Sequence, residues 1–166
     1  MLFLFLLVFS FGGVQAQPDG ARLPWKMELL KKRASAYEST AFHDRLIMAR
    51  NDSYKVTLSF EEEGYCYIVR ENDEGRLPLV YRKNVSGGES ITLPEDGSDF
   101  RAGDLIGTSR LYVIFSPVPM QHLTKLMEQH ESETPTVSLD RSLLSEVLAI
   151  RRSEPSMVIT VTVRVQ

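Results

Sequence analysis

The alternation of hydrophobic and polar residues predicts a series of β-strands from residue 54 onward. In residues 54–60, Val56, Leu58 and Phe60 alternate with polar side chains, the pattern of a strand with one buried face. Further strands are predicted at residues 65–70, 77–82, 89–93 and 110–116, with turns containing Gly, Asn or Asp between several of them. The segment 110–116 is hydrophobic on both faces, which is typical of a central strand that is covered from two sides.

Hydrophobic residues recur at helical spacing in three other segments. Residues 25–37 are predicted to form a short helix, and residues 120–129 a second one. The third helix is predicted to begin at Ser138 as its N-cap and to run through Arg151. The hydrophobic positions of the three helices are Trp25, Leu29, Leu30 and Ala34; Leu123, Leu126 and Met127; and Leu143, Leu144, Val147, Leu148 and Ile150.

The C-terminal residues 157–165 show the clearest strand pattern in the chain. The side chains predicted to face inward are Met157, Ile159, Val161, Val163 and Val165. Such a hydrophobic strand is expected to pair within the sheet built by residues 54–116, with residues 117–155 crossing over outside it. The elements predict a mainly β protein of the α+β class: an antiparallel β-sandwich or open barrel with two helices inserted before the C-terminal strand.

The N-terminus has the pattern of a secretory signal peptide. A hydrophobic run of about a dozen residues is too short to span a bilayer as a helix, and Val14 and Ala16 occupy the small-residue positions of a cleavage site. We therefore expect residues 1–16 to be removed and the protein to be periplasmic or secreted, without stable membrane insertion afterwards. An uncleaved membrane anchor and a buried first strand are the alternatives. Residues 17–50 are predicted as a linker and a short helix, and residues 51–166 as a single β-rich domain.

Composition narrows the range of partners. The chain has 166 residues, and 19 basic against 22 acidic side chains give a net charge of −3, so no nucleic-acid partner is expected. The 43% of hydrophobic and 25% of charged residues are ordinary for a globular protein. A single cysteine excludes an internal disulfide framework.

Cys66 and the three histidines are the candidates for nucleophilic or metal chemistry. Cys66 with His43, His122 or His130 could form a nucleophile–base pair, but its place inside a predicted strand favours hydrophobic packing. Pairing of Cys66 with another chain is a further alternative. His122 and His130 are eight residues apart, which is not the spacing of a metal-binding helix, and they are expected to be surface residues.

Other motifs do not identify a site. The acidic turns lack the regular spacing of oxygen ligands that calcium loops require, so we expect them to be solvated. Asn51-Asp52-Ser53 and Asn84-Val85-Ser86 match the glycosylation sequon, which matters only in a eukaryotic secretory pathway. No catalytic residue, cofactor-binding residue or metal ligand is predicted.

The segment 53–119 resembles the bacterial exported domain family of unknown function DUF4384. The resemblance is carried by Gly64-Tyr65-Cys66-Tyr67-Ile68-Val69, the turn at Gly75 with the strand 77–81, Asn84, Gly88-Glu89, Leu93-Pro94, Gly107 and the stretch 111–119. Thr108-Ser109-Arg110 departs from the family pattern, which has an acidic residue there. The resemblance implies an exported β-rich module without established catalytic residues, attached in some members to peptidase-like or kinase-like domains.

The sequence therefore predicts an exported, non-enzymatic module that binds a protein or another component of the cell envelope or its surroundings. A small secreted hydrolase with an unrecognised site and a purely structural envelope protein are the alternatives.

Overall fold

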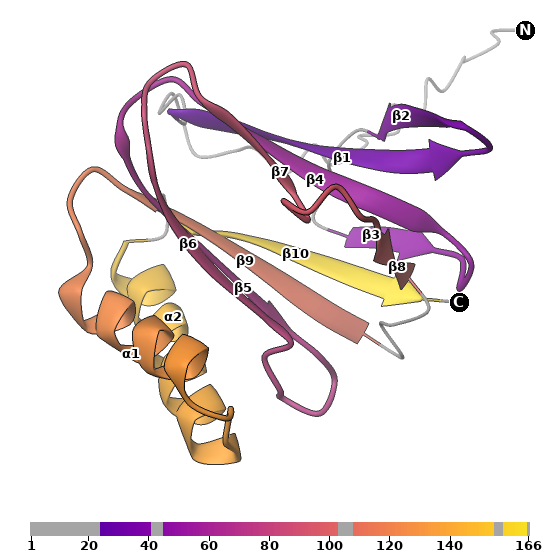
Figure 1. Cartoon of the computed structure of the whole chain (residues 1–166). Coiled ribbons are helices and arrows are strands. Elements are labelled where there is room, and N and C mark those ends of the chain that lie inside the picture. The colour runs from indigo at the N-terminus through magenta and orange to yellow at the C-terminus, as the bar shows by residue number, and fades with distance from the viewer. Residues whose placement is uncertain (1–23, 41–44, 103–107, 155–157, 166) are drawn as a thin grey trace, which may run out of the picture.

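The computed structural model describes residues 24–40, 45–102, 108–154 and 158–165 (Figure 1). These residues form two five-stranded sheets and two helices, without closure of the sheets into a barrel. The β-rich, sandwich-like α+β fold predicted from the sequence is thus confirmed. In the described part of the chain, neither helix is long and hydrophobic enough to cross a membrane.

The first sheet, sheet A, is entirely antiparallel. It contains β1 (Trp25–Arg33), β2 (Ala36–Thr40), β4 (Ser53–Phe60), β7 (Ser90–Leu93) and β8 (Phe100–Arg101). Its strand order is β2-β1-β4-β7, and β8 pairs with the beginning of β4.

The second sheet, sheet B, has the order β3-β10-β9-β5-β6. Its strands are β3 (Arg45–Met48), β5 (Gly64–Glu71), β6 (Leu79–Val85), β9 (Thr108–Ser116) and β10 (Val158–Val165). β10 pairs antiparallel with β9 and parallel with β3, so the C-terminal strand lies inside the sheet. β9 lies between β10 and β5, as its two hydrophobic faces predicted.

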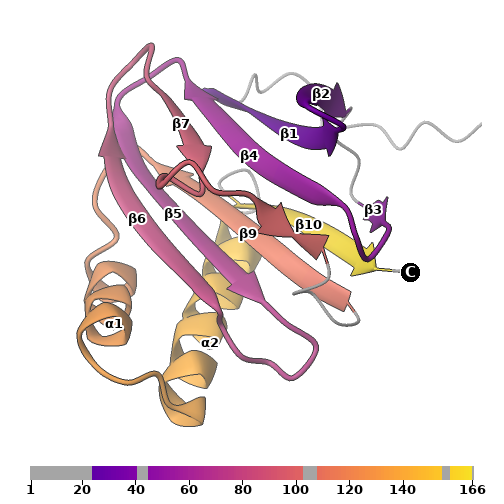
Figure 2. The ribbon, with the colours of Figure 1, turned by 45° about the vertical axis from the view of Figure 1, so that its right-hand side comes forward.

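Helices α1 (Gln121–Ser132) and α2 (Val137–Ser153) cover the face of sheet B that points away from sheet A (Figure 2). They lie in the chain between β9 and β10, so residues 117–154 cross over outside the sandwich as predicted. α2 begins one residue before the predicted N-cap Ser138. The actual cap is Thr136, whose hydroxyl oxygen accepts a hydrogen bond from the Leu139 amide at 3.2 Å.

Sheet B separates two hydrophobic cores. Along β5, Cys66 and Ile68 point toward sheet A, whereas Tyr67 and Val69 point toward the helices. The core between the sheets is formed mainly by Trp25, Leu29, Tyr54, Val56, Leu58, Phe60, Cys66, Ile68, Val113, Phe115, Val161 and Val163. The core under the helices contains Tyr67, Val69, Tyr112, Ile114, Leu123, Met127, Leu143, Val147, Ile150 and Val158.

The short helix predicted over residues 25–37 is wrong, because this segment forms β1, a turn and β2. Trp25 and Leu29 are four residues apart, a spacing that fits both one helical turn and two periods of a strand. In the structure both are buried, the exposed Lys26 and Glu28 lie between them, and β1 pairs with β4. The assignment of residues 17–50 to a linker and helix is therefore wrong for β1 and β2, which belong to sheet A, and for β3, which belongs to sheet B.

Two smaller predictions concern the segments near β8 and β10. No strand is predicted from the sequence between residues 93 and 110, but Phe100 and Arg101 form β8. In β10, Val161 and Val163 are buried between the sheets, and Ile159 and Val165 pack against the same core. The fifth inward residue, Met157, lies outside the described residues, as do residues 1–16 and His43.

Truncation of the chain after Glu154 should abolish the cooperative folding of the protein. Each buried valine of β10 contributes about 1.5–3 kcal/mol, which is large against a typical stability of about 5–15 kcal/mol, and the truncation also leaves the hydrophobic strand β9 unpaired on one side. Thermal unfolding followed by circular dichroism tests this. Arg164→Ala, at an exposed position of β10, should melt like the wild type. A soluble truncated protein with a cooperative melt would contradict the prediction.

Candidate functional site

Cys66 is part of the core between the sheets, as predicted. Its side chain is inaccessible to solvent, and burial raises the pKa of its thiol to about 12. A thiol with that pKa is protonated at neutral pH and is a poor nucleophile. Cys66 therefore serves packing in the described structure.

Cys66 should resist thiol reagents in the native protein and react once the protein unfolds. Replacement by Ser places a hydroxyl in the same buried position, which should lower the free energy of unfolding by about 1–3 kcal/mol. Reaction with a chromogenic disulfide reagent, with and without denaturant, measures the first effect, and denaturant titration the second. Rapid labelling of the folded protein would show that the thiol is accessible.

The two histidines of α1 lie in different surroundings. His122 is exposed as predicted, with Nε2 3.7 Å from a carboxylate oxygen of Glu146. The prediction of a surface position is wrong for His130, whose side chain is only 10% exposed. Its Nε2 lies 3.2 Å from Oδ1 of Asp140, which α2 places beneath it.

Asp140 is a buried carboxylate that joins three segments of the fold. Its side chain is 1% exposed and lies between His130 and Arg76, whose Nε is 3.0 Å from Oδ2. Arg76 also donates a hydrogen bond to the Pro135 carbonyl oxygen at 3.0 Å. These contacts tie the β5–β6 hairpin to both helices. No group of three potential metal-binding side chains occurs among the described residues.

A second polar cluster connects the β1–β2 hairpin to the loop before β8. Asp99 accepts hydrogen bonds from the Tyr37 hydroxyl and from Lys32, the latter at 2.8 Å, and Lys55 lies 3.9 Å away. The hydrogen bonds from Lys32 and Tyr37 lower the pKa of Asp99, and the Asp99 carboxylate raises the pKa of Lys32. The cluster thus forms an ion-pair network on the sheet A side of the molecule.

Asp99→Asn should lower the melting temperature at neutral pH. A carboxylate whose pKa is lowered by folding stabilises the native state above its ordinary value of 3.8, and this contribution disappears as the pH falls through the lowered pKa. The difference between variant and wild type should therefore narrow below about pH 3.8. Asp73→Asn makes the same charge change at an exposed position in a turn and serves as the control. An equal effect of both variants at neutral pH would contradict the assignment.

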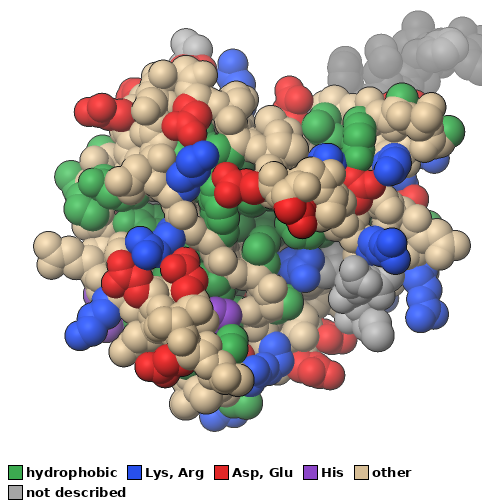
Figure 3. Space-filling model, viewed as in Figure 1, with side chains coloured by type: hydrophobic (Ala, Val, Ile, Leu, Met, Phe, Trp, Pro, Cys, Tyr) green, Lys and Arg blue, Asp and Glu red, His purple; other side chains and the backbone are tan. Residues whose placement is uncertain are grey.

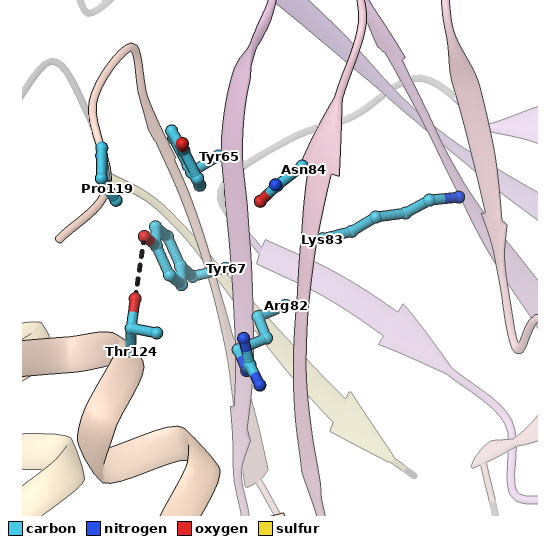
Figure 4. A pocket seen from close by; sticks show the side chains of 7 residues that line it. All are labelled: Tyr65, Tyr67, Arg82, Lys83, Asn84, Pro119 and Thr124. Carbon is cyan, nitrogen blue, oxygen red and sulfur yellow. Dashed lines mark hydrogen bonds between the residues drawn. The ribbon is translucent and has the colours of Figure 1, made fainter. Parts of the chain in front are cut away.

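A further feature is a cleft of about 510 Å³ where α1 meets the end of sheet B opposite the β5–β6 hairpin (Figure 4). This volume lies within the range of about 300–1,000 Å³ that is usual for ligand sites. It is lined by Tyr65, Tyr67, Arg82, Lys83, Asn84, Pro119 and Thr124.

Tyr67 fixes the position of the helix layer beside the cleft. Its hydroxyl accepts a hydrogen bond from the Met120 amide at 2.9 Å and lies 3.2 Å from Oγ1 of Thr124. The side chain is 2% exposed, so its ring is largely unavailable to a ligand. These two contacts hold the beginning of α1 against β5.

Tyr65 and Asn84 form the accessible wall. They face each other across the β5–β6 pair, which places both on the side of sheet B that carries the helices. Tyr65 is half-buried and Asn84 is exposed. Among the described residues, neither the Tyr65 hydroxyl nor the Asn84 amide has a hydrogen-bond partner. Figure 4 shows Tyr65 and Asn84 on either side of the β5 ribbon, both farther from α1 than Tyr67.

Gly64 explains why β5 can approach β9 closely just before Tyr65. A Cβ atom at this position would lie 2.7 Å from both the Phe115 ring and the Ser116 carbonyl oxygen. Any side chain at this position would therefore force the two strands apart. Glycine at residue 64 thus helps to set the position of Tyr65 at the edge of the cleft.

The cations of the cleft are paired with carboxylates. Arg82 lies 3.2 Å from Glu128 and 3.5 Å from Glu131, both on α1. Lys83 extends away from the cleft (Figure 4) and forms ion pairs at 3.1 Å with Glu89 and at 3.5 Å with Glu95. Figure 3 shows acidic and basic side chains intermixed over this view of the molecule rather than gathered by sign.

Sequence reasoning did not identify this cleft. It used Tyr65, Tyr67 and Asn84 as residues that carry the resemblance to DUF4384, and Asn84 also as part of a sequon. The Tyr-x-Tyr alternation does predict that both rings lie on one face of a strand. The position of α1, which buries one ring and leaves the other accessible, depends on the tertiary fold.

Comparisons with known proteins provide no family for this chain. No family model and no curated protein matches it. Among solved structures, a β-glucosidase from Listeria innocua in complex with gluconolactone is similar, with a TM-score of 0.26 and 11% sequence identity. The match covers 84% of this chain but only 16% of that protein, and similarity at this level carries no functional inference. The resemblance to DUF4384 stays a prediction.

Proposed function

We propose that the chain is an exported, non-enzymatic β-sandwich module that binds a partner in the cell envelope or its surroundings through the Tyr65–Asn84 cleft. The cleft itself is the observation that carries this proposal. It combines a partly exposed aromatic ring with an amide and a hydroxyl that have no described partners within the protein. Such a combination of hydrophobic surface and free polar groups is typical of ligand sites.

The surroundings of the candidate catalytic groups favour binding over catalysis. Cys66 is a buried thiol with a raised pKa, and His130 is held by the buried Asp140. Among the described residues, no activated nucleophile lies beside a base in the way that covalent catalysis requires. Export is supported by the signal-peptide pattern of residues 1–16 and by the resemblance to an exported family.

The proposal predicts binding to the envelope fraction of the cells that produce the protein. The native protein should co-sediment with this fraction, and Tyr65→Ala should weaken the binding at least tenfold because it removes the exposed ring. Tyr37→Ala removes a partly exposed tyrosine from sheet A and is the matched control, with thermal melts confirming that both variants fold.

Equal binding by Tyr65→Ala and the wild type would show that the cleft is not the site. A hydrolytic activity that is abolished by His122→Ala or Cys66→Ala would contradict the non-enzymatic assignment.

A further inference from the structure

We infer that the Tyr65–Asn84 cleft binds an uncharged saccharide, with the Tyr65 ring as stacking surface and the Asn84 amide as the group that recognises hydroxyls. This inference rests on the proposed function and specifies the chemical class of its ligand. It follows from the charge and the aromatic surface of the cleft, and from its hydrogen-bonding groups that have no partner among the described residues.

The charge of the cleft favours a neutral ligand. Arg82 is held by two glutamates of α1, and Lys83 by Glu89 and Glu95. An anion in the cleft would have to compete with Glu128 and Glu131 for Arg82, since Lys83 extends away from the cleft (Figure 4). A cation would find no acidic side chain among the cleft-lining residues. The positive charge is therefore already compensated within the protein.

The hydrophobic part of the cleft is a single ring rather than an extended hydrophobic groove. The Tyr67 ring is buried, so Tyr65 alone offers an aromatic face, with Pro119 across the cleft (Figure 4). An aromatic face carries partial negative charge. The C–H groups on one side of a pyranose ring carry partial positive charge and fit such a face.

The polar part of the cleft matches the other side of a sugar. The Asn84 amide offers two donors and an acceptor, and the Tyr65 hydroxyl is both donor and acceptor. Directly opposite residues of paired strands have Cβ atoms about 4.5–5.5 Å apart, so amide and ring reach one ligand together. Neighbouring hydroxyls of a sugar act as donor and acceptor at once and can satisfy the amide.

An extended peptide is the competing ligand. It would use the edge of β6 that pairs with no other described strand, and would gain most of its affinity from backbone hydrogen bonds. Arg82 and Lys83 are charged residues of the kind that discourage strand addition at an edge. The charged edge and the isolated aromatic ring favour the saccharide.

The direct test is an array of neutral oligosaccharides probed with the native protein. We expect binding to a defined subset, measured afterwards by calorimetry. Tyr65→Ala and Asn84→Ala should each weaken it at least tenfold, whereas Tyr65→Phe, which keeps the ring, should retain most of it. Asn51→Ala, at an exposed asparagine in a turn, is the control for Asn84→Ala. Absence of binding to every neutral glycan, or binding that both variants leave unchanged, would overturn the inference.

A second experiment separates this inference from the proposed function. The envelope fraction is treated either with periodate, which cleaves the vicinal diols of sugars, or with protease. Loss of Tyr65-dependent binding after periodate alone supports a saccharide. Loss of this binding after protease treatment alone would overturn the inference of a saccharide ligand, while the proposed binding function of the cleft would still hold. Binding that does not depend on Tyr65 would show that the cleft is not the binding site, and both proposals would then be wrong.

Discussion

The central strands of sheet B, β5 and β9, carry buried side chains on both faces, so other elements of the fold must pack against each face. Burying apolar surface is the main favourable contribution to folding. A sheet that is hydrophobic on two sides therefore needs a layer on each. Sheet A provides one layer through Trp25, Leu29 and Leu58, and the two helices provide the other through Leu123, Met127 and Val147. The order of the layers follows from this requirement.

The candidate site arises where this cover ends. α1 begins at Gln121, and its first turn is held to β5 by the hydroxyl of Tyr67. Further along the same face of the sheet, Tyr65 and Asn84 extend past the helix and remain accessible (Figure 4). The cleft is thus the boundary of the helix layer. Beside Tyr65, Gly64 permits the close approach of β5 to β9.

Several charged residues of the described structure form ion pairs with one another. The buried Asp140 joins both helices to the β5–β6 hairpin through His130 and Arg76. Burial of a carboxylate is tolerated only when such partners are present. On the sheet A side of the molecule, Asp99 forms ion pairs with Lys32 and Lys55. The cleft groups that have no hydrogen-bond partner among the described residues, the Tyr65 hydroxyl and the Asn84 amide, are neutral.

The sequence alone predicted the strands 54–60, 65–70 and 110–116, the two late helices and the C-terminal strand. Alternation indicates the strands 54–60 and 157–165, helical spacing indicates the two helices, and a short continuous hydrophobic run indicates the central strand 110–116. The sequence also placed Cys66 in the core, since alternation assigns a face to every residue of a strand. It failed for residues 25–37, where Trp25 and Leu29 fit two periods at once. This segment forms a strand because β1 pairs with β4, a contact between segments that are distant in the chain.

The cleft and the burial of His130 were decided by the tertiary structure alone. A pattern along one chain segment shows which face of an element is hydrophobic, but not which element covers it or where that cover stops. The side chain of His130 is largely shielded from solvent because α2 places Asp140 against it. Tyr65 is partly accessible because α1, which begins at Gln121, does not extend over it. Both outcomes depend on how the helices pack on sheet B, a relation between distant segments that no local period contains.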